Sequence, residues 1–152
     1  MTLKQWQDNG WLRPHQTSTQ EIENLLAIVD RDLHDAASSE ISTDWQFGIA
    51  YNAALKLCTI LLYAEGFRAA TGLQHYRTIQ AISLILGKSL KEDVAFLDAC
   101  RKKRNIVEYD AAGMATEKEA NELREFAIEF RKTVLEWLKQ SHPELCQGLF
   151  GN

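Results

Sequence analysis

The residues best suited to chemistry lie in one basic stretch, RKKRNIVEYDAAG, at positions 101–113. Four consecutive cations are followed by Asn105, and Tyr109 stands five residues after Arg104. The guanidinium of an arginine presents a planar fork of donors that matches phosphate. A phenol can donate a hydrogen bond to phosphate or stack on a base. The stretch is therefore either a phosphate-binding site or the solvated end of a helix, where cations complement the helix dipole.

Arg104 is expected on the apolar side of the helix that ends in this stretch. It recurs at three- and four-residue spacing with Leu97, Cys100 and Val107, which is typical of one helix face. Burying an unpaired charge is costly, so an inward-facing guanidinium needs a partner. That partner is either a bound phosphate or an internal acid such as Glu108, one turn further on.

His75 is the second candidate, because it opens the helix-like run LQHYRTIQ. An imidazole titrates near neutral pH and can serve as a general base or acid. The alternative is a helix-start histidine bonded to backbone or water. Arg68 and Arg77 either add to a cationic groove or are surface charges. Asn52 and Lys56 lie one turn apart on the most apolar run, where we interpret them as a solvent-facing edge rather than the wall of a cleft.

The composition limits the classes of partner. With 152 residues the chain is about one domain long, and its net charge of −4 gives no global cationic field toward nucleic acid or membrane. RNA contact would need a local patch. No Cys or His pair has ligand spacing and no cofactor motif occurs, so we expect neither metal nor cofactor. Three free thiols and no signal-type N-terminus predict a cytoplasmic protein without membrane contact; the thiols are Cys58, Cys100 and Cys146.

Helix signals dominate the chain. Capping boxes of the form S/T-x-x-E/Q precede five runs, at Ser18, Thr43, Thr71, Ser89 and Thr116. No strand is predicted, since no stretch alternates apolar and polar residues for long enough. The second run is apolar around most of its circumference and is expected at the centre of the fold. The predicted helices lie near 18–38, 43–66, 73–86, 90–110 and 116–140.

These elements predict an all-α fold, an antiparallel bundle of four or five helices. We expect residues 17–142 to form the bundle, with residues 1–16 as a peripheral N-terminal segment and residues 143–152 as a C-terminal tail. Within the N-terminal segment, Trp6, Trp11 and Leu12 could pack onto the bundle.

The order of elements resembles the HEPN superfamily of small helical-bundle domains. Three stretches carry the resemblance: AYNAALKLCTILLYAEGFRA, then HYRTIQAISLILG, then RKKRNIVEYD followed by a capped final helix. Together they span roughly residues 18–140. The resemblance implies a HEPN-like bundle that forms a homodimer.

The nuclease members of that family carry an Arg, a polar residue and, five positions after the Arg, a His. Arg and His of two protomers face each other across a dimer cleft and cut RNA without a metal. In this chain Arg104 matches the Arg and Asn105 the polar residue, whereas Tyr109 stands at the place of the His. A phenol with a pKa of about 10 is a poor general base at neutral pH.

The resemblance therefore implies a non-catalytic or weakly catalytic HEPN partner module. It would bind a nucleotidyltransferase-domain protein of toxin–antitoxin type, or RNA, at a dimer cleft near Arg104. Arg101, Asn105 and His75 would be further binding residues. The alternative is a toxin-like, metal-independent endoribonuclease in which Tyr109 or a histidine such as His75 works with Arg104. A third possibility, a helical interaction domain without a ligand, predicts that Arg104 is held in an internal ion pair.

Overall fold

The computed structural model describes residues 1–148 as six α-helices packed against each other, with one small sheet. The described chain is 74% helical, so the predicted all-α class is confirmed. Two strands, β1 (Leu12–Pro14) and β2 (Phe67–Ala69), form the sheet. The helices are α1 (Leu3–Asp8), α2 (Thr19–Asp35), α3 (Thr43–Ala64), α4 (Gln74–Leu86), α5 (Lys91–Asn105) and α6 (Glu117–Ser141).

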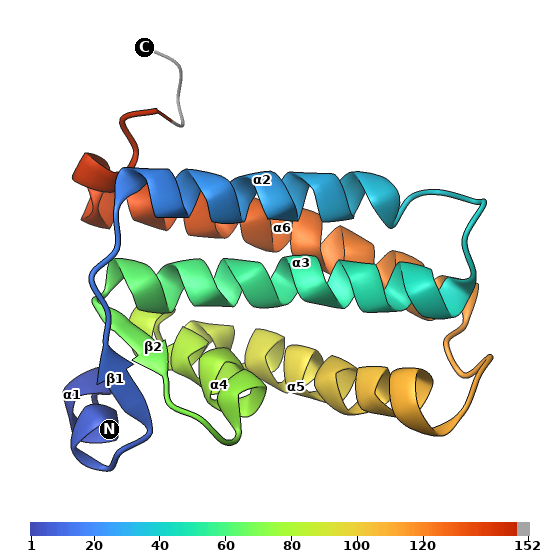
Figure 1. Ribbon diagram of the computed structural model, residues 1–152, viewed down its shortest axis with the longest axis horizontal. Coiled ribbons are helices and arrows are strands. Elements are labelled where there is room, and N and C mark those ends of the chain that lie inside the picture. Colours follow the sequence, from blue (N-terminus) through green and yellow to red (C-terminus); the bar gives the residue numbers. More distant parts are fainter. Residues whose placement is uncertain (149–152) are drawn as a thin grey trace.

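Figure 1 shows α3 in the middle of the bundle, with α2 and α6 on one side and α4 and α5 on the other. In Figure 1, α2 and α5 run in one direction along the bundle, and α3 and α6 run in the opposite direction. A π-helical turn, Ile106–Asp110, directly continues α5. Short 3₁₀ turns follow α4 at Lys88–Leu90 and α6 at Pro143–Leu145. The five predicted helical runs are thus present, and the N-terminal α1 is an additional helix.

Helix α3 is central because it is apolar around most of its circumference. It packs against α2, α4, α5 and α6, and its fully buried side chains include Leu57, Ile60 and Leu61. By length and composition alone, α3 is long and apolar enough to cross a membrane. However, 61% of its most apolar stretch of 18 residues is buried inside the protein. A buried core helix of a bundle can have the same length and apolar composition as a membrane-spanning helix. Cys58 of α3 is buried, as are Cys100 and Cys146, and all three are free thiols as predicted.

One predicted capping box is confirmed in part, at Ser18, and one in full, at Thr116. The Ser18 hydroxyl accepts from the Glu21 amide at the start of α2. Thr116 and Glu119 form a complete reciprocal box at the start of α6, with hydroxyl-to-amide and carboxylate-to-amide distances of 3.1 and 3.0 Å. Each bond satisfies an amide of the first helical turn that has no partner within the helix.

The other three predicted caps are wrong. Ser42, one residue earlier than Thr43, caps α3, and the Thr43 hydroxyl donates instead to the Ala115 carbonyl at 2.9 Å. Helix α4 begins after Leu73, which has a left-handed φ of 52°, and α5 begins after Leu90. Neither of these two helices has a side-chain cap, so the boxes predicted at Thr71 and Ser89 do not form.

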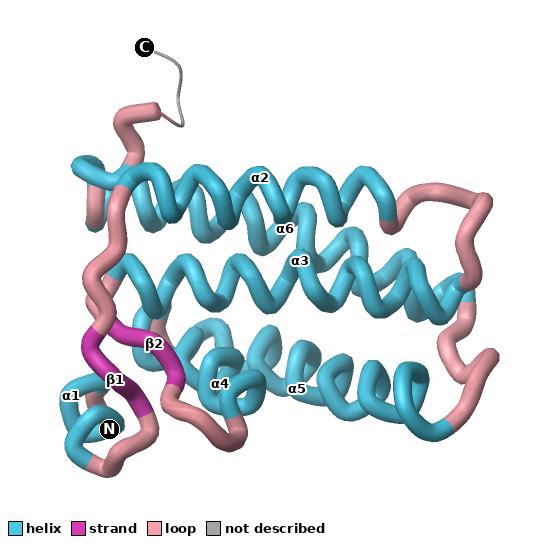
Figure 2. The backbone as a smooth tube through the Cα atoms, in the orientation of Figure 1, coloured by secondary structure: helices cyan, strands magenta, loops and turns pink. Residues whose placement is uncertain are grey.

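The N-terminal segment is packed onto one end of the bundle. Trp6 and Leu12 are buried with Leu62 of α3 and Ala81 of α4. Strand β1 pairs antiparallel with β2, which places Arg13 directly opposite Arg68. Figure 2 shows this sheet between α1 and the end of α3. The sheet corrects the prediction that no strand forms; each strand is only three residues long, too short for a visible alternation.

The chain after α6 also contacts the core. Leu145 and Cys146 are buried and belong to the main hydrophobic cluster. Gly148 lies so close to Glu23 of α2 that a Cβ atom added at this position would meet the Glu23 side chain. The remainder of the predicted C-terminal tail, residues 149–152, lies outside the described residues.

Candidate functional site

Arg104 is held by an acid on its own helix. Its Nη2 atom lies 2.8 Å from the Glu108 Oε2 atom, and its side chain is 24% exposed. The acid expected one turn further on is therefore present, which is the outcome that the alternative of an interaction domain without a ligand predicts. The Arg104 Nε atom is buried and has no hydrogen-bond partner among the described residues. One donor of the guanidinium fork is thus paired, and another is left without an acceptor.

A pocket of about 480 Å³ opens beside this ion pair. It lies between the start of α3 and the end of α5, and its lining includes Arg104, Glu108, Asp44, Trp45 and Val107. Two carboxylates and one guanidinium give these side chains a net negative charge. Such a lining is unfavourable for phosphate, because like charges repel in a partly desolvated site.

Asp44 has a structural role in this pocket. Its two carboxylate oxygens accept from the backbone amides of Gly113 and Ala115, at 2.6 and 3.1 Å. The loop between α5 and α6 is thereby fixed to the first turn of α3. Gly113 adopts a φ of 75°, which is accessible to glycine at little cost.

Tyr109 does not join Arg104 in the pocket. It lies on the π-helical turn, is 74% exposed, and is not among the residues that line the pocket. In this turn the Ala111 amide donates to the Ile106 carbonyl, five residues back, at 2.9 Å. The wider turn changes the direction of the side chains relative to a regular α-helix.

Exposed apolar side chains gather at the same end of the bundle. Trp45 is 61% exposed, and Ile106 and Met114 are exposed as well. Together with Tyr109 they come from the start of α3, the π-helical turn and the α5–α6 loop. We call these four residues, Trp45, Ile106, Tyr109 and Met114, the apolar rim. Large exposed apolar groups of this kind are candidates for contact with a partner.

The three predicted binding residues meet in a different pocket. His75, Arg101 and Asn105 line a hollow of about 350 Å³ between the start of α4 and the end of α5. Arg101 is paired with Asp98, with Nε and Oδ1 2.8 Å apart, and its guanidinium lies over the Tyr76 ring at 5.4 Å. The structure thus brings these three residues together and separates them from Tyr109.

Tyr51 contacts one residue of each pocket, Arg104 and His75, and was not predicted from the sequence. Its hydroxyl lies 3.4 Å from His75 Nδ1, and its ring centroid lies 5.7 Å from Cζ of Arg104. The side chain is almost fully buried, and burial raises its pKa. A signal for it exists in the sequence, because a tyrosine within the most apolar helix needs a polar partner.

His75 stays uncharged more readily than an ordinary histidine. Partial burial lowers its pKa, and the positive charges of Arg104, Lys56 and Arg101 lower it further. A neutral imidazole can accept a proton or a hydrogen bond at neutral pH. The site around Tyr51 therefore joins a neutral imidazole to two arginines, both of which are already paired with acids.

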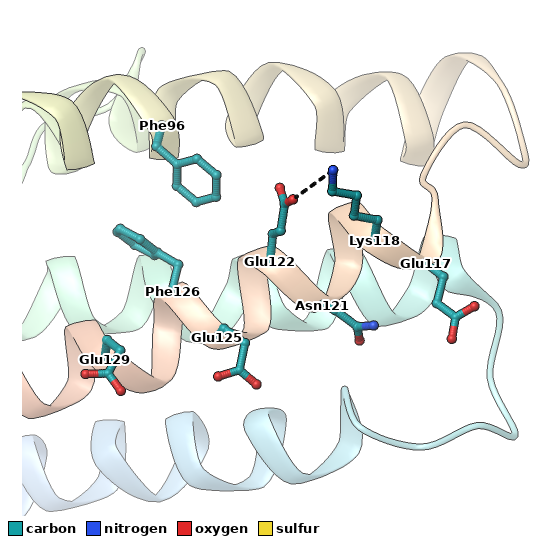
Figure 3. A pocket seen from close by; sticks show the side chains of 8 residues that line it. All are labelled: Phe96, Glu117, Lys118, Asn121, Glu122, Glu125, Phe126 and Glu129. Atoms are coloured by element: carbon teal, nitrogen blue, oxygen red, sulfur yellow. Dashed lines mark ion pairs between the residues drawn. The ribbon is translucent and has the colours of Figure 1, made fainter.

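A further hollow is a groove between α5 and α6, of about 920 Å³. Figure 3 shows Phe96 and Phe126 pointing toward each other in it, with ring centroids 4.9 Å apart. Its one lining cation, Lys118, pairs with a glutamate of the next turn at 3.8 Å. An anionic ligand is disfavoured there, because four lining side chains are carboxylates: Glu117, Glu122, Glu125 and Glu129.

Comparison with models of protein families, with curated proteins and with solved structures found no match to this chain. Among residues 1–148, no three His, Cys, Asp or Glu side chains are grouped in a way that could hold a metal ion.

Proposed function

We propose that this protein is a HEPN-like helical module that associates with a second copy of itself through the apolar rim. The surface that contacts the second copy includes the Arg104 pocket, so that Arg104 of each protomer lies at the cleft between the two. A nucleotidyltransferase-domain protein, as in toxin–antitoxin systems, is the further partner class that the HEPN resemblance implies. The observation that carries the proposal is the exposed Trp45 side chain in the lining of a pocket with an unsatisfied arginine donor, with the exposed Tyr109 on the turn that follows α5.

The unsatisfied donor supports a partner rather than a solvated surface. A buried donor without an acceptor costs about 1–3 kcal/mol. The Arg104 Nε atom has that status in the single chain. An acceptor of a second protomer would remove this cost once the Arg104 side chain shifts to expose the atom, which is inaccessible in the single chain. Aromatic side chains such as Trp45 and Tyr109 are also enriched among the residues that contribute most to protein interfaces.

The arrangement argues against efficient RNA cleavage at Arg104. The guanidinium is already paired with Glu108, and the pocket has a second carboxylate in Asp44. Tyr109 points elsewhere within one chain and is a poor base at neutral pH. We therefore propose a cytoplasmic binding module that is non-catalytic or weakly catalytic.

Removing the two aromatic side chains of the rim is expected to weaken self-association. In the Trp45→Ala/Tyr109→Ala variant we expect the dimer dissociation constant to rise at least about tenfold, which corresponds to about 1.4 kcal/mol. Sedimentation velocity over a range of protein concentrations measures this change. Both residues are exposed in the single chain, so the fold itself should be retained.

The matched control is Phe126→Ala, which truncates an aromatic side chain in the α5–α6 groove instead. It should leave the dissociation constant unchanged. A wild-type chain that remains monomeric at the highest concentration reached contradicts self-association. A loss of association in the Phe126 variant alone would place the interface in the groove and would equally contradict the proposal.

A metal-independent ribonuclease is the second candidate, and it is favoured by the neutral imidazole of His75 linked through Tyr51 to Arg104. Under the main proposal, wild-type protein in EDTA should cleave neither structured nor single-stranded RNA. Gel analysis of labelled RNA tests this expectation. Cleavage that disappears in both Arg104→Ala and His75→Ala, but persists in Lys88→Ala, would instead establish the nuclease.

A further inference from the structure

Another pocket shares His75 with the hollow that contains Arg101 and Asn105. It has a volume of about 290 Å³ and is enclosed by α3, β2 and α4, with one leucine from α2. In Figure 1 these elements meet at the end of the bundle that carries the sheet. None of its lining residues is Asp or Glu. Its polar side chains include Lys56, Thr59, Tyr63, Arg68, His75 and Thr78.

The two permanent cations of this pocket are unpaired. Neither Lys56 nor Arg68 forms an ion pair with any residue in the described part of the chain. By contrast, Arg101 and Arg104 are paired with acids of their own helix. In a protein with a net charge of −4, this pocket is therefore a local concentration of uncompensated positive charge.

The sheet adds a third cation beside the pocket. Arg13 of β1 lies directly opposite Arg68 of β2 in the antiparallel ladder. Residues paired in this way project from the same face of a sheet, and like charges there are destabilising. An anion bound at Arg68 would offset this repulsion. The acid whose charge acts on Tyr63, Glu21, is already bonded by His15 and Thr17 at 2.7 Å each.

Neutral donors also face the pocket. Thr78 is only 7% exposed, and its hydroxyl has no hydrogen-bond partner among residues 1–148. The residue is buried as a whole, but its hydroxyl oxygen is not among the inaccessible unsatisfied atoms, so it is open to a ligand in the pocket. The Thr59 hydroxyl donates to the Leu55 carbonyl and can only accept from a ligand. The first-turn amides of α4 are also free of a side-chain cap.

We infer that Lys56, Arg68 and Thr78 form a binding site for a phosphate monoester. The arginine supplies a fork of donors and the lysine a compact charge, which together match a group that carries close to two negative charges. The buried threonine supplies a neutral donor. Leu25, Leu55 and Leu62 form the apolar part of the wall, against which the carbon skeleton of the ligand would pack.

This site does not depend on the proposed dimer. The phosphate could be carried by a free nucleoside monophosphate or by the 5′ end of an RNA, which have the same terminal chemistry. Isothermal titration calorimetry with four probes separates the sources: adenosine, adenosine 5′-monophosphate, and one short oligoribonucleotide with and without a 5′-phosphate. We expect the phosphorylated member of each pair to bind and the other to bind at least about tenfold more weakly.

Variants assign the binding to this pocket. Lys56→Gln and Arg68→Gln should each raise the dissociation constant of adenosine 5′-monophosphate at least about tenfold, and Thr78→Val severalfold. Lys88→Gln removes an exposed cation outside the pocket and should change nothing. If only the RNA pair shows the phosphate preference, the same variants are measured with the phosphorylated RNA.

Two results would overturn the inference: no preference for the phosphate in either pair, or a preference that survives both the Lys56 and the Arg68 substitution. The Trp45→Ala/Tyr109→Ala variant should bind the phosphorylated probes like the wild type. Loss of self-association with retained phosphate binding, or the reverse, therefore distinguishes failure of this inference from failure of the proposed function.

Discussion

The Leu57→Ala variant is expected to lose about 2–5 kcal/mol of its free energy of unfolding. Leu57 is fully buried in the middle of α3, the helix that packs against α2, α4, α5 and α6. Removing its side chain eliminates apolar contacts and leaves a cavity that a helix held on several sides cannot close. Urea unfolding at neutral pH, followed by circular dichroism, measures the loss.

The control for this prediction is Trp45→Ala in the same helix. Trp45 is larger than Leu57 but 61% exposed at the first turn of α3. Its removal should change the free energy of unfolding by no more than about 0.5 kcal/mol, as is usual for surface positions. Similar losses in both variants would mean that α3 is not the central helix of the bundle.

The Asn52→Leu variant is expected to lose about 1–3 kcal/mol of its free energy of unfolding, although it exchanges a polar for an apolar side chain. Asn52 of α3 donates to a carboxylate oxygen of Asp32 in α2 at 2.6 Å. Asp32 is only 5% exposed, and its other oxygen lies 3.0 Å from Arg31 Nη2. Without Asn52 a buried carboxylate oxygen loses its donor, which is costly.

A double-mutant cycle tests this explanation. If the cost comes from the unpaired carboxylate, Asp32→Leu/Asn52→Leu should be less destabilised than the sum of the two single variants, by about 0.5–3 kcal/mol. Replacing both members of a buried pair by apolar groups of similar shape can be nearly neutral. Additive losses would show that the two side chains do not interact.

This pair also corrects the interpretation of Asn52 and Lys56 as a solvent-facing edge. Asn52 instead joins two helices, and Lys56 lines the pocket beside His75. The sequence places both residues on one stripe of α3, because helical spacing depends only on that helix. It does not reveal which neighbour covers the stripe. Only the packing of α2 and α4 against α3 decides that.

The helices themselves were predictable because their signals are local. Periodic apolar residues and hydroxyl caps act within one or two turns, which suffices for α2 and α6. Helix starts were less predictable: Leu73 and Leu90 precede α4 and α5 without a polar cap, so tertiary packing has to position these ends. The sheet was missed for the same reason, since its two strands are far apart in the sequence and satisfy each other only in the folded chain.

The candidate site was predictable in part. The pairing of Arg104 with Glu108 follows from their spacing of one helical turn, and it is present. The meeting of His75 with Arg101 depends on the packing of α4 against α5. The position of Tyr109 depends on a π-helical turn that has no recognisable pattern in residues 106–110. Its role in binding, like that of Arg104, stays a prediction.

The β1–β2 ladder has a consequence for the order in which the molecule assembles. It joins the segment before α2 to the segment after α3, so its two strands can meet only once α2 and α3 have folded back on each other. Arg68 belongs to that ladder and also to the wall of the pocket proposed to bind phosphate. We therefore expect this end of the protein to form late and to be the first to open, with the pocket becoming competent only in the completed native state.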